Sequence, residues 1–228
     1  MQRKVYVVIV AGGSGTRMGG DTPKQFLEID GVPVLQRTIE RFVSAIPGIK
    51  IITVLPGEHF STWKDLCLKH SFFCPQMLVE GGLTRFHSVR NALENIPDGA
   101  IVGIHDGVRP FISIELIRKL YSMMETETAV VPMLRITDSL KFADGSFPEP
   151  DRNNIVSVQT PQLFRSEDIK AAYLQAYDPA FTDDVSVAVR NGLHVSFAEG
   201  EKLNIKLTTR EDLILAGAIL DSERRTTE

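Results

Sequence analysis

Residues 5–26 read VYVVIVAGGSGTRMGGDTPKQF. The apolar run at 5–10 predicts a strand buried in the core of a sheet. The glycines that follow leave the backbone free to adopt positive φ angles, so that amide N–H groups can converge on anionic oxygens. Arg17 lies within this loop, and Lys24 follows just after Pro23. A strand, a glycine loop and two cations together predict a binding site for a polyphosphate.

Known phosphate-binding motifs do not match this loop. A Walker A loop needs a Gly-Lys-Ser/Thr tripeptide, and the sequence contains none. The dinucleotide fingerprint G-x-G-x-x-G fails because Met18 stands in place of the third glycine. A plain turn is the alternative interpretation, since glycine-rich turns are common. The two cations argue against it, because a turn has no use for them.

Composition narrows the class of protein. The 228 residues are 43% apolar, which is enough for one large α/β domain with a sizeable core. The 25 basic and 29 acidic residues argue against a nucleic-acid partner, because such binders carry a basic face. No apolar run approaches the roughly 20 residues that cross a bilayer, and no signal pattern precedes the first strand. We therefore expect a cytoplasmic protein without a membrane partner, with Cys67 and Cys74 as free thiols.

Strand-like and helix-like patterns alternate along the sequence. Apolar runs indicate strands at 5–10, 51–55, 101–104 and 129–131. Helical patterns follow, with Leu35, Ile39, Phe42 and Val43 on one face behind Pro33, and further helices at 85–93, 113–124, 166–177 and from about Thr209. This order predicts an α/β fold with one Rossmann-like, mostly parallel twisted sheet and helices on both faces. Ligands of such sheets bind beyond the carboxyl ends of the strands, where the glycine loop and residues 105–110 (HDGVRP) fall.

Residues 137–160 break this alternation. Leu140 and Phe142 alternate with polar residues before Asp144-Gly145, a strong hairpin turn signal. We expect a β-hairpin arm inserted into a single domain that spans 1–228. Because a two-stranded arm is only marginally stable alone, a second copy of the chain is the economical partner. A surface insertion that packs on nothing is the alternative.

Collinear segments over nearly the whole chain resemble the cytidylyltransferases that make 4-diphosphocytidyl-2-C-methylerythritol in the non-mevalonate isoprenoid pathway. The matching segments are AGGSGTRMGG, PKQF, GGLTRFHSV, HDGVRP, DRNN, TPQLF, FTDD and NIKLTTREDL. A sister family transfers CMP to ribitol 5-phosphate, and the HDGVRP segment resembles that family too. We favour the methylerythritol phosphate family on overall likeness.

The resemblance implies an in-line attack by the phosphate of a polyol phosphate on the α-phosphorus of CTP, with loss of pyrophosphate. Such chemistry depends on positioning and charge rather than on acid–base catalysis. Arg17 and Lys24 match the two catalytic cations beside the α-phosphate. The residues matched to CTP binding are Gly12, Gly13, Ser14, Gly15, Gly82, Ser88 and Asp106. Leu83 departs from the acidic residue common in the family, and a helix-entry turn is an equal interpretation of Arg85 and His87.

The polyol phosphate side is matched in the same way. The implied contacts are Arg109, Ser139, Arg152, Thr160, Thr182 and Lys206. In the family, the arm dimerises and sends residues at the positions of Ser139 and Arg152 into the neighbouring site, so we expect a homodimer. Mg²⁺ is the expected cofactor because it neutralises a triphosphate and prefers oxygen ligands. Asp106 is its candidate protein ligand, or else contacts the polyol hydroxyls, while Thr160 also has a purely structural interpretation.

Several residues differ from the family pattern. Ser139 replaces the more usual threonine, and Gly107 and Val108 replace two alanines. Val185 and Ala188 also differ, which leaves the helix after Thr182 less well defined by the resemblance.

Two other functions compete with the transferase. A nicotinamide-dependent oxidoreductase with a variant Rossmann loop is disfavoured by Met18 and by the paired cations. A non-catalytic nucleotide-binding protein is disfavoured because Arg17, Lys24 and Asp106 are all present.

Overall fold

The computed structural model describes residues 3–13, 22–146, 148 and 150–227. Within them, one eight-stranded sheet has the order β10-β7-β9-β6-β1-β4-β5, with β8 paired to β7. The strands of this sheet are β1 (Val5–Val10), β4 (Lys50–Leu55), β5 (Gln76–Glu80), β6 (Ile101–Asp106), β7 (Ala129–Arg135), β8 (Val156–Val158), β9 (Gln162–Arg165) and β10 (Ser196–Glu199). A small antiparallel pair, β2 (Glu28–Ile29) and β3 (Val32–Pro33), lies apart from it.

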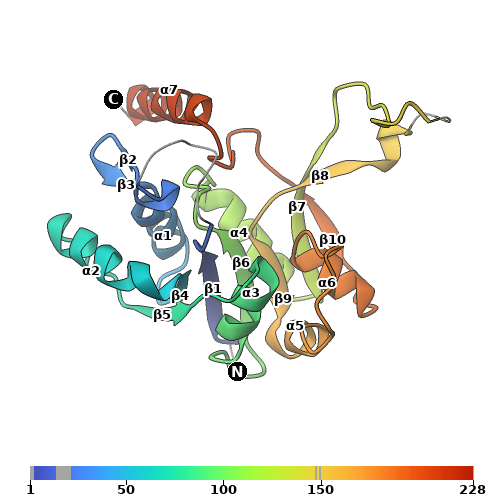
Figure 1. The fold of residues 1–228 in the computed structure, drawn as a ribbon, viewed down its shortest axis with the longest axis horizontal. Helices are drawn as coiled ribbons and strands as arrows, with labels where there is room; N and C mark the ends of the chain where they lie inside the picture. Colours follow the sequence, from blue (N-terminus) through green and yellow to red (C-terminus); the bar gives the residue numbers. More distant parts are fainter. Residues whose placement is uncertain (1–2, 14–21, 147, 149, 228) are drawn as a thin grey trace.

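Helices cover both faces of the sheet (Figure 1). Their bounds are α1 (Val34–Ala45), α2 (Phe60–Lys69), α3 (Arg85–Leu93), α4 (Ile114–Met123), α5 (Ser166–Ala172), α6 (Asp184–Arg190) and α7 (Arg210–Thr227). Successive strand residues point to opposite faces, so Val7 and Ile9 of β1 pack with α1, α2 and α4, whereas Val8 packs with α3, α5 and α6. Both faces of β1 are therefore buried, as the apolar run at 5–10 predicts.

The sheet is mostly parallel, and the predicted α/β class is confirmed. The central strands β6, β1, β4 and β5 pair in parallel, while β9 runs antiparallel between β6 and β7. Val10 at the end of β1 is in register with Asp106 at the end of β6. The glycine loop and the HDGVRP segment therefore begin side by side at one edge of the sheet.

The arm differs from its prediction. Its ladder joins Met133, Leu134 and Arg135 of β7 to β8, and the described residues between these two strands form no further strand. Leu140 and Phe142 are thus not in a strand, although the predicted turn at Asp144-Gly145 is present, with Gly145 at a φ of 73°. Beyond Arg135 the arm stands away from the sheet (Figure 1), so it has no neighbouring strand or core to order a longer ladder.

Five other features were predicted incompletely or missed. Val43 is 40% exposed, because α1 turns that position away from the buried stripe. The helix from Ser166 ends at Ala172 rather than at 177. Strands β5, β9 and β10 were missed, since each is short and lacks a clear apolar alternation.

Several termini match their sequence signals. Ser113 accepts a hydrogen bond from the Leu116 amide as the N-cap of α4. Asp183 forms a capping box with Ser186 at the start of α6. Helix α3 spans the predicted residues 85–93, and α7 begins one residue after Thr209.

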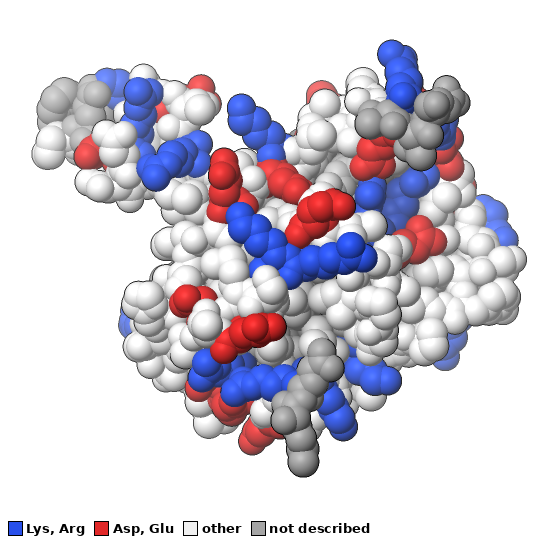
Figure 2. Space-filling view, turned by 180° about the vertical axis from the view of Figure 1, so that it is seen from behind, with Lys and Arg blue, Asp and Glu red and all other residues white. Residues whose placement is uncertain are grey.

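The mixed charges on the surface and the free state of both cysteines agree with what the composition predicts. Figure 2 shows basic and acidic side chains interspersed over the rear face, with the arm at the upper left. Among the described residues, no helix is both long and apolar enough to span a bilayer. Cys67 and Cys74 are free thiols, and burial raises the pKa of Cys67 to about 11.

Candidate active site

A pocket of about 260 Å³ opens at the carboxyl edge of the sheet, where β1 and β6 end. It is lined by predicted site residues from separate segments, namely Gly12, Gly13, Lys24, Gly82, Ser88, Asp106 and Lys206. Lys24 reaches it from a 3-10 turn, Lys24–Phe26. The pocket thus joins the glycine loop, the GGLTRFHS segment and the HDGVRP segment, as the α/β topology predicts.

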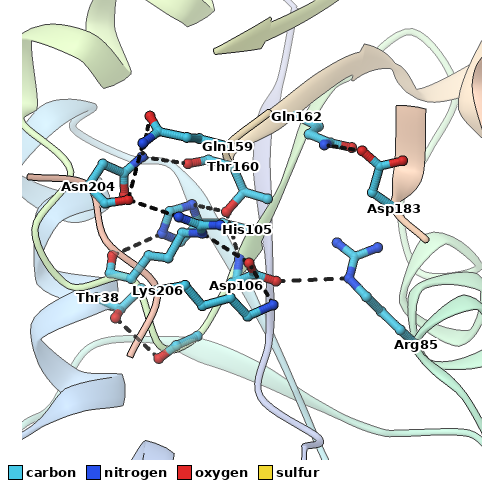
Figure 3. Close-up of polar contacts among 12 residues, drawn as sticks. Thr38, Arg85, His105, Asp106, Gln159, Thr160, Gln162, Asp183, Asn204 and Lys206 are labelled. Carbon is cyan, nitrogen blue, oxygen red and sulfur yellow. Dashed lines mark hydrogen bonds and ion pairs between the residues drawn. The ribbon is translucent and has the colours of Figure 1, made fainter. Parts of the chain in front are cut away.

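One carboxylate organises the polar side of the pocket. Asp106 Oδ2 lies 3.0 Å from Arg109 Nε and 3.1 Å from Lys206 Nζ, and Asp106 Oδ1 lies 3.9 Å from Arg85 Nε. We call these four residues the Asp106 cluster. Figure 3 shows Asp106 between Lys206 and Arg85. Burial alone would raise the pKa of Asp106, but the charges of Arg85, Lys206 and Arg109 hold it well below its usual range.

The backbone that carries Asp106 is held from several directions. In the turn Asp106–Arg109, the Arg109 amide donates to the Asp106 carbonyl, and the Gly107 amide donates to the Val10 carbonyl at 2.8 Å. The Thr38 hydroxyl on α1 donates to the Gly107 carbonyl, and the Leu207 amide donates to the Val108 carbonyl. A Cβ at Gly107 would lie 2.8 Å from that of Ala11, so the turn approaches the start of the glycine loop closely.

Lys206 is positioned by a buried amide network. Gln159 Nε2 donates to the Glu201 carbonyl at 2.8 Å, and Asn204 Nδ2 donates to the Thr160 carbonyl at 3.0 Å. Arg109 donates to the Asn204 carbonyl at 2.8 Å. The loop before Lys206 is therefore tied to both the Asp106 cluster and the segment before β9 (Figure 3).

Arg85 bridges the two sides of the pocket. Its guanidinium makes a bidentate pair with Asp184, at 2.8 and 2.6 Å, and the Tyr173 hydroxyl donates to the same carboxylate. Burial alone would lower the pKa of Arg85, but the charge and hydrogen bonds of Asp184 raise it. Because Asp184 is fully buried, this pair fixes the guanidinium beside Asp106.

The GGLTRFHS segment forms a tight loop before α3. The Gly82 amide donates to Ser88 Oγ at 3.0 Å, and that hydroxyl donates to the Thr84 carbonyl. A Cβ on Gly82 would lie 2.4 Å from His87 Cβ, so only glycine fits without rearrangement. Leu83 is 96% exposed at the pocket, which leaves backbone groups rather than its side chain to contact a polar ligand.

The structure separates the predicted site residues into groups. Arg109 pairs with Asp106 but does not line the pocket, and Thr160 is buried. Thr182 is exposed just before the Asp183 cap of α6. Ser139 and Arg152 are exposed on the arm, where Arg152 donates to the Thr137 carbonyl. Ser14, Gly15 and Arg17 lie outside the described residues.

Sequence reasoning did not single out Arg85 and Asp184 as a pair. Arg85 opens α3, where a cation opposes the helix dipole, so its presence there was a signal of a specific anionic partner. Gln159 and Asn204 were also missed, because amide networks leave no distinctive spacing in a sequence.

The contacts of Asp106 do not fit a magnesium ligand. A divalent cation on this carboxylate would lie against Lys206 and Arg109, with Arg85 nearby, and like charges repel strongly in a partly buried site. Among the described residues, no group of three or more His, Cys, Asp or Glu side chains is arranged to hold a metal.

His105 gives a test of the buried side of the site. Burial lowers the pKa of this imidazole from 6.5 to about 4. Between these two pH values the unfolded chain binds a proton at His105 that the folded chain does not bind, and this proton favours the unfolded state. Stability should thus be full above pH 6.5 and decrease as pH falls. From pH 7 to pH 5, His105 should lower the free energy of unfolding by about 2 kcal/mol.

Urea unfolding at both pH values measures this change, with His105→Gln as the comparison. Between pH 7 and pH 5, the free energy of unfolding of the variant should fall by about 2 kcal/mol less than that of the parent protein. Equal pH dependence in the two proteins would show that His105 is not held neutral by burial.

Comparison with known proteins identifies the family. Residues 5–222 match the family model IspD, 2-C-methyl-D-erythritol 4-phosphate cytidylyltransferase. The chain is 45% identical to the enzyme of that name from Bacteroides thetaiotaomicron, covering 95% of this chain and 100% of the relative. It is 47% identical to the one from Porphyromonas gingivalis, covering 97% and 100%.

A solved structure supports the same assignment. The crystal structure of 4-diphosphocytidyl-2C-methyl-D-erythritol synthase from Anaerococcus prevotii has a TM-score of 0.81 and 31% identity, covering 96% of each chain. The sequence match, the shared fold and the pocket at the sheet edge agree. The chain belongs to the IspD family of 2-C-methyl-D-erythritol 4-phosphate cytidylyltransferases.

Proposed function

We propose that the pocket catalyses in-line attack of the phosphate of 2-C-methyl-D-erythritol 4-phosphate on the α-phosphorus of CTP. Family membership gives the overall reaction, which is CTP-dependent cytidylyl transfer to this polyol phosphate. The products are 4-diphosphocytidyl-2-C-methyl-D-erythritol and pyrophosphate. The new bond is between a substrate phosphate oxygen and the α-phosphorus, and the bond that breaks releases pyrophosphate.

One observation carries the proposal. Lys24, Lys206 and Arg85 line one pocket beside the glycine loop. Arg109 does not line this pocket but pairs with Asp106, which does. Two anions must approach each other in this reaction, and the charge that develops is stabilised by fixed cations rather than by a proton donor.

We assign the nucleotide half of the pocket by the family resemblance. Arg17 and Lys24 stabilise the transition state and the departing pyrophosphate. The backbone of Gly12, Gly13 and Gly15, together with Ser14, binds the triphosphate. Because Ser88 is hydrogen bonded within its own loop, its role is to shape the backbone around Gly82 that contacts the cytosine.

We assign the polyol phosphate to the side of Lys206, Arg109 and Thr182. Its phosphate competes with Asp106 for the two cations, which lie at hydrogen-bond distance from the carboxylate. Since Arg109 is mostly covered, Lys206 is the more accessible of the two, with its side chain 40% exposed. Asp106 can then accept hydrogen bonds from the hydroxyls of the polyol.

The cofactor is a divalent cation in this proposal, with Mg²⁺ as the expected ion. Triphosphate oxygens are ligands that Mg²⁺ prefers, so the triphosphate of CTP would hold the ion, which would neutralise part of its charge. No step is assigned to a metal on Asp106, because the neighbouring cations disfavour it.

We further propose that the protein is a cytoplasmic homodimer. The arm projects from the body, and Phe142 and Ile155 on it are exposed apolar side chains. Arm residues Ser139 and Arg152 would then reach the partner's pocket, so that each site is shared between two copies. A nucleic-acid partner is not expected, since the net charge is −4.

Pyrophosphate release from CTP and Mg²⁺ tests the function directly. We expect release with 2-C-methyl-D-erythritol 4-phosphate and little with D-ribitol 5-phosphate. Release only with D-ribitol 5-phosphate would show that the protein instead transfers CMP to ribitol 5-phosphate, as the sister family does. Release with neither would contradict the proposed activity, and oxidation of NADH by candidate substrates would then be examined.

Lys24→Ala should reduce turnover by a factor on the order of 10²–10³, because it removes a fixed charge beside the transition state. The affinity for CTP should change little, since other groups hold the nucleotide. Steady-state turnover and CTP titration measure the two effects separately. Lys64→Ala, on the exposed side of α2, is the matched control and should behave as the parent does. Parental turnover in Lys24→Ala would remove Lys24 from the chemistry.

Subunit mixing tests the shared site. Arg17→Ala and Arg152→Ala should each be inactive alone, yet a mixture that exchanges subunits should regain about a quarter of the parental sites. Arg17→Ala mixed with Lys24→Ala is the control and should regain none, because both residues belong to the same copy's site. No recovery in confirmed Arg17→Ala/Arg152→Ala heterodimers would exclude a contribution of Arg152 across the dimer.

A further inference from the structure

Thr160 and His105 are both buried beneath the Asp106 cluster, and neither lines the pocket. Thr160 Oγ1 lies 3.1 Å from the Asp106 amide nitrogen and 3.1 Å from His105 Nδ1. On the far side of the imidazole, His105 Nε2 lies 3.1 Å from the Arg109 carbonyl oxygen. Figure 3 shows His105 and Thr160 side by side next to Asp106.

The hydrogen positions follow from these partners. The Arg109 carbonyl can only accept, so His105 Nε2 carries the proton and donates it. A neutral imidazole protonated on Nε2 has a bare Nδ1, which accepts from the Thr160 hydroxyl. The oxygen of that hydroxyl accepts from the Asp106 amide. Every group therefore has a partner of the right kind, and we call this sequence of hydrogen bonds the His105–Thr160 bridge.

We propose that His105 and Thr160 are positioning residues that together hold the Asp106–Arg109 turn, and that the Thr160 hydroxyl does not contact the polyol phosphate. The bridge fixes the first amide and the last carbonyl of that turn, which carries the carboxylate and one phosphate-binding cation. This inference rests on the proposed function, because it concerns the geometry of the same site.

The alternative is the direct contact that the family resemblance implies for Thr160. In the structure its hydroxyl already donates once, to His105, and accepts once, from Asp106. The substrate's phosphate oxygens can only accept, so a contact with them would have to break the bond to His105 and leave a buried Nδ1 unpaired. A polyol hydroxyl could reach the remaining lone pair of the Thr160 oxygen only through the residues that bury it.

Four variants separate these two roles. Thr160→Val keeps the shape and removes both hydrogen bonds, whereas Thr160→Ser keeps them. His105→Gln places an amide where it can still donate to the Arg109 carbonyl but offers no acceptor at Nδ1. His105→Asn has the opposite defect, since its oxygen can accept from Thr160 but its side chain is too short for Arg109.

The kinetic expectation is specific. Thr160→Val and His105→Gln should each lower kcat/KM for the polyol phosphate by roughly 10- to 100-fold, because small misplacements of a binding group are costly. Thr160→Ser should remain within about threefold of the parent, and His105→Asn should also lose activity through Arg109. The double variant Thr160→Val/His105→Gln should be no worse than either single variant, because both break the same bridge.

Other outcomes would overturn the proposal. If His105→Gln keeps the parental kcat/KM while Thr160→Val loses it, Thr160 acts directly on the substrate. If both variants unfold at lower temperature but keep kcat/KM per CTP-binding site, the bridge serves stability alone. Additive losses in the double variant would mean two independent roles.

A measurement on the parent protein needs neither activity nor a variant that folds. Nitrogen-15 NMR of the imidazole should show His105 as the neutral tautomer with its proton on Nε2. A proton on Nδ1 would contradict the bridge even in an active enzyme. Because the parent is assayed with CTP and the polyol phosphate alongside, failure of the proposed function would be seen separately as an inactive parent.

Discussion

The site depends on one buried carboxylate that is shared by three cations. Asp106 holds Arg109 and Lys206 through one oxygen and has Arg85 near the other. Without it, these cations would repel one another in a partly buried site. The carboxylate therefore allows positive charge to be gathered before any phosphate arrives. Because Asp106 is the last residue of the central strand β6, the sheet holds its backbone in place and so fixes the position of the cluster.

The surrounding structure serves that arrangement. β1 and β6 end in register, the Asp106–Arg109 turn is bonded to α1, β1 and the segment before α7, and Asp184 fixes Arg85 from α6. Preorganised charge of this kind lowers the barrier without reorganisation during the reaction. In the proposed reaction the attacking group is an oxygen of the substrate phosphate, so the chemistry needs no protein nucleophile.

The sequence predicted what depends on local pattern. Apolar runs located β1, β4, β6 and β7, and helical patterns located α3, α4 and the start of α7, because these signals act within a few neighbours. It also placed the glycine loop and Asp106 at one edge. It missed the pairing of Arg85 with Asp184, which are 99 residues apart, and the antiparallel β9, whose partners are set by the whole sheet. The arm was only partly predicted, because its conformation beyond Arg135 depends on what covers it rather than on its alternation.

In the proposed reaction, charge and position alone transfer the cytidylyl group in one step. The stereochemical course at the α-phosphorus tests it most directly, using CTP made chiral there by one sulfur substituent and a stereochemical analysis of the product. Inversion is predicted, because a single in-line displacement turns over the configuration at phosphorus. Retention would rule out a single displacement, since it would require two displacements and a covalent nucleotidyl intermediate on the protein.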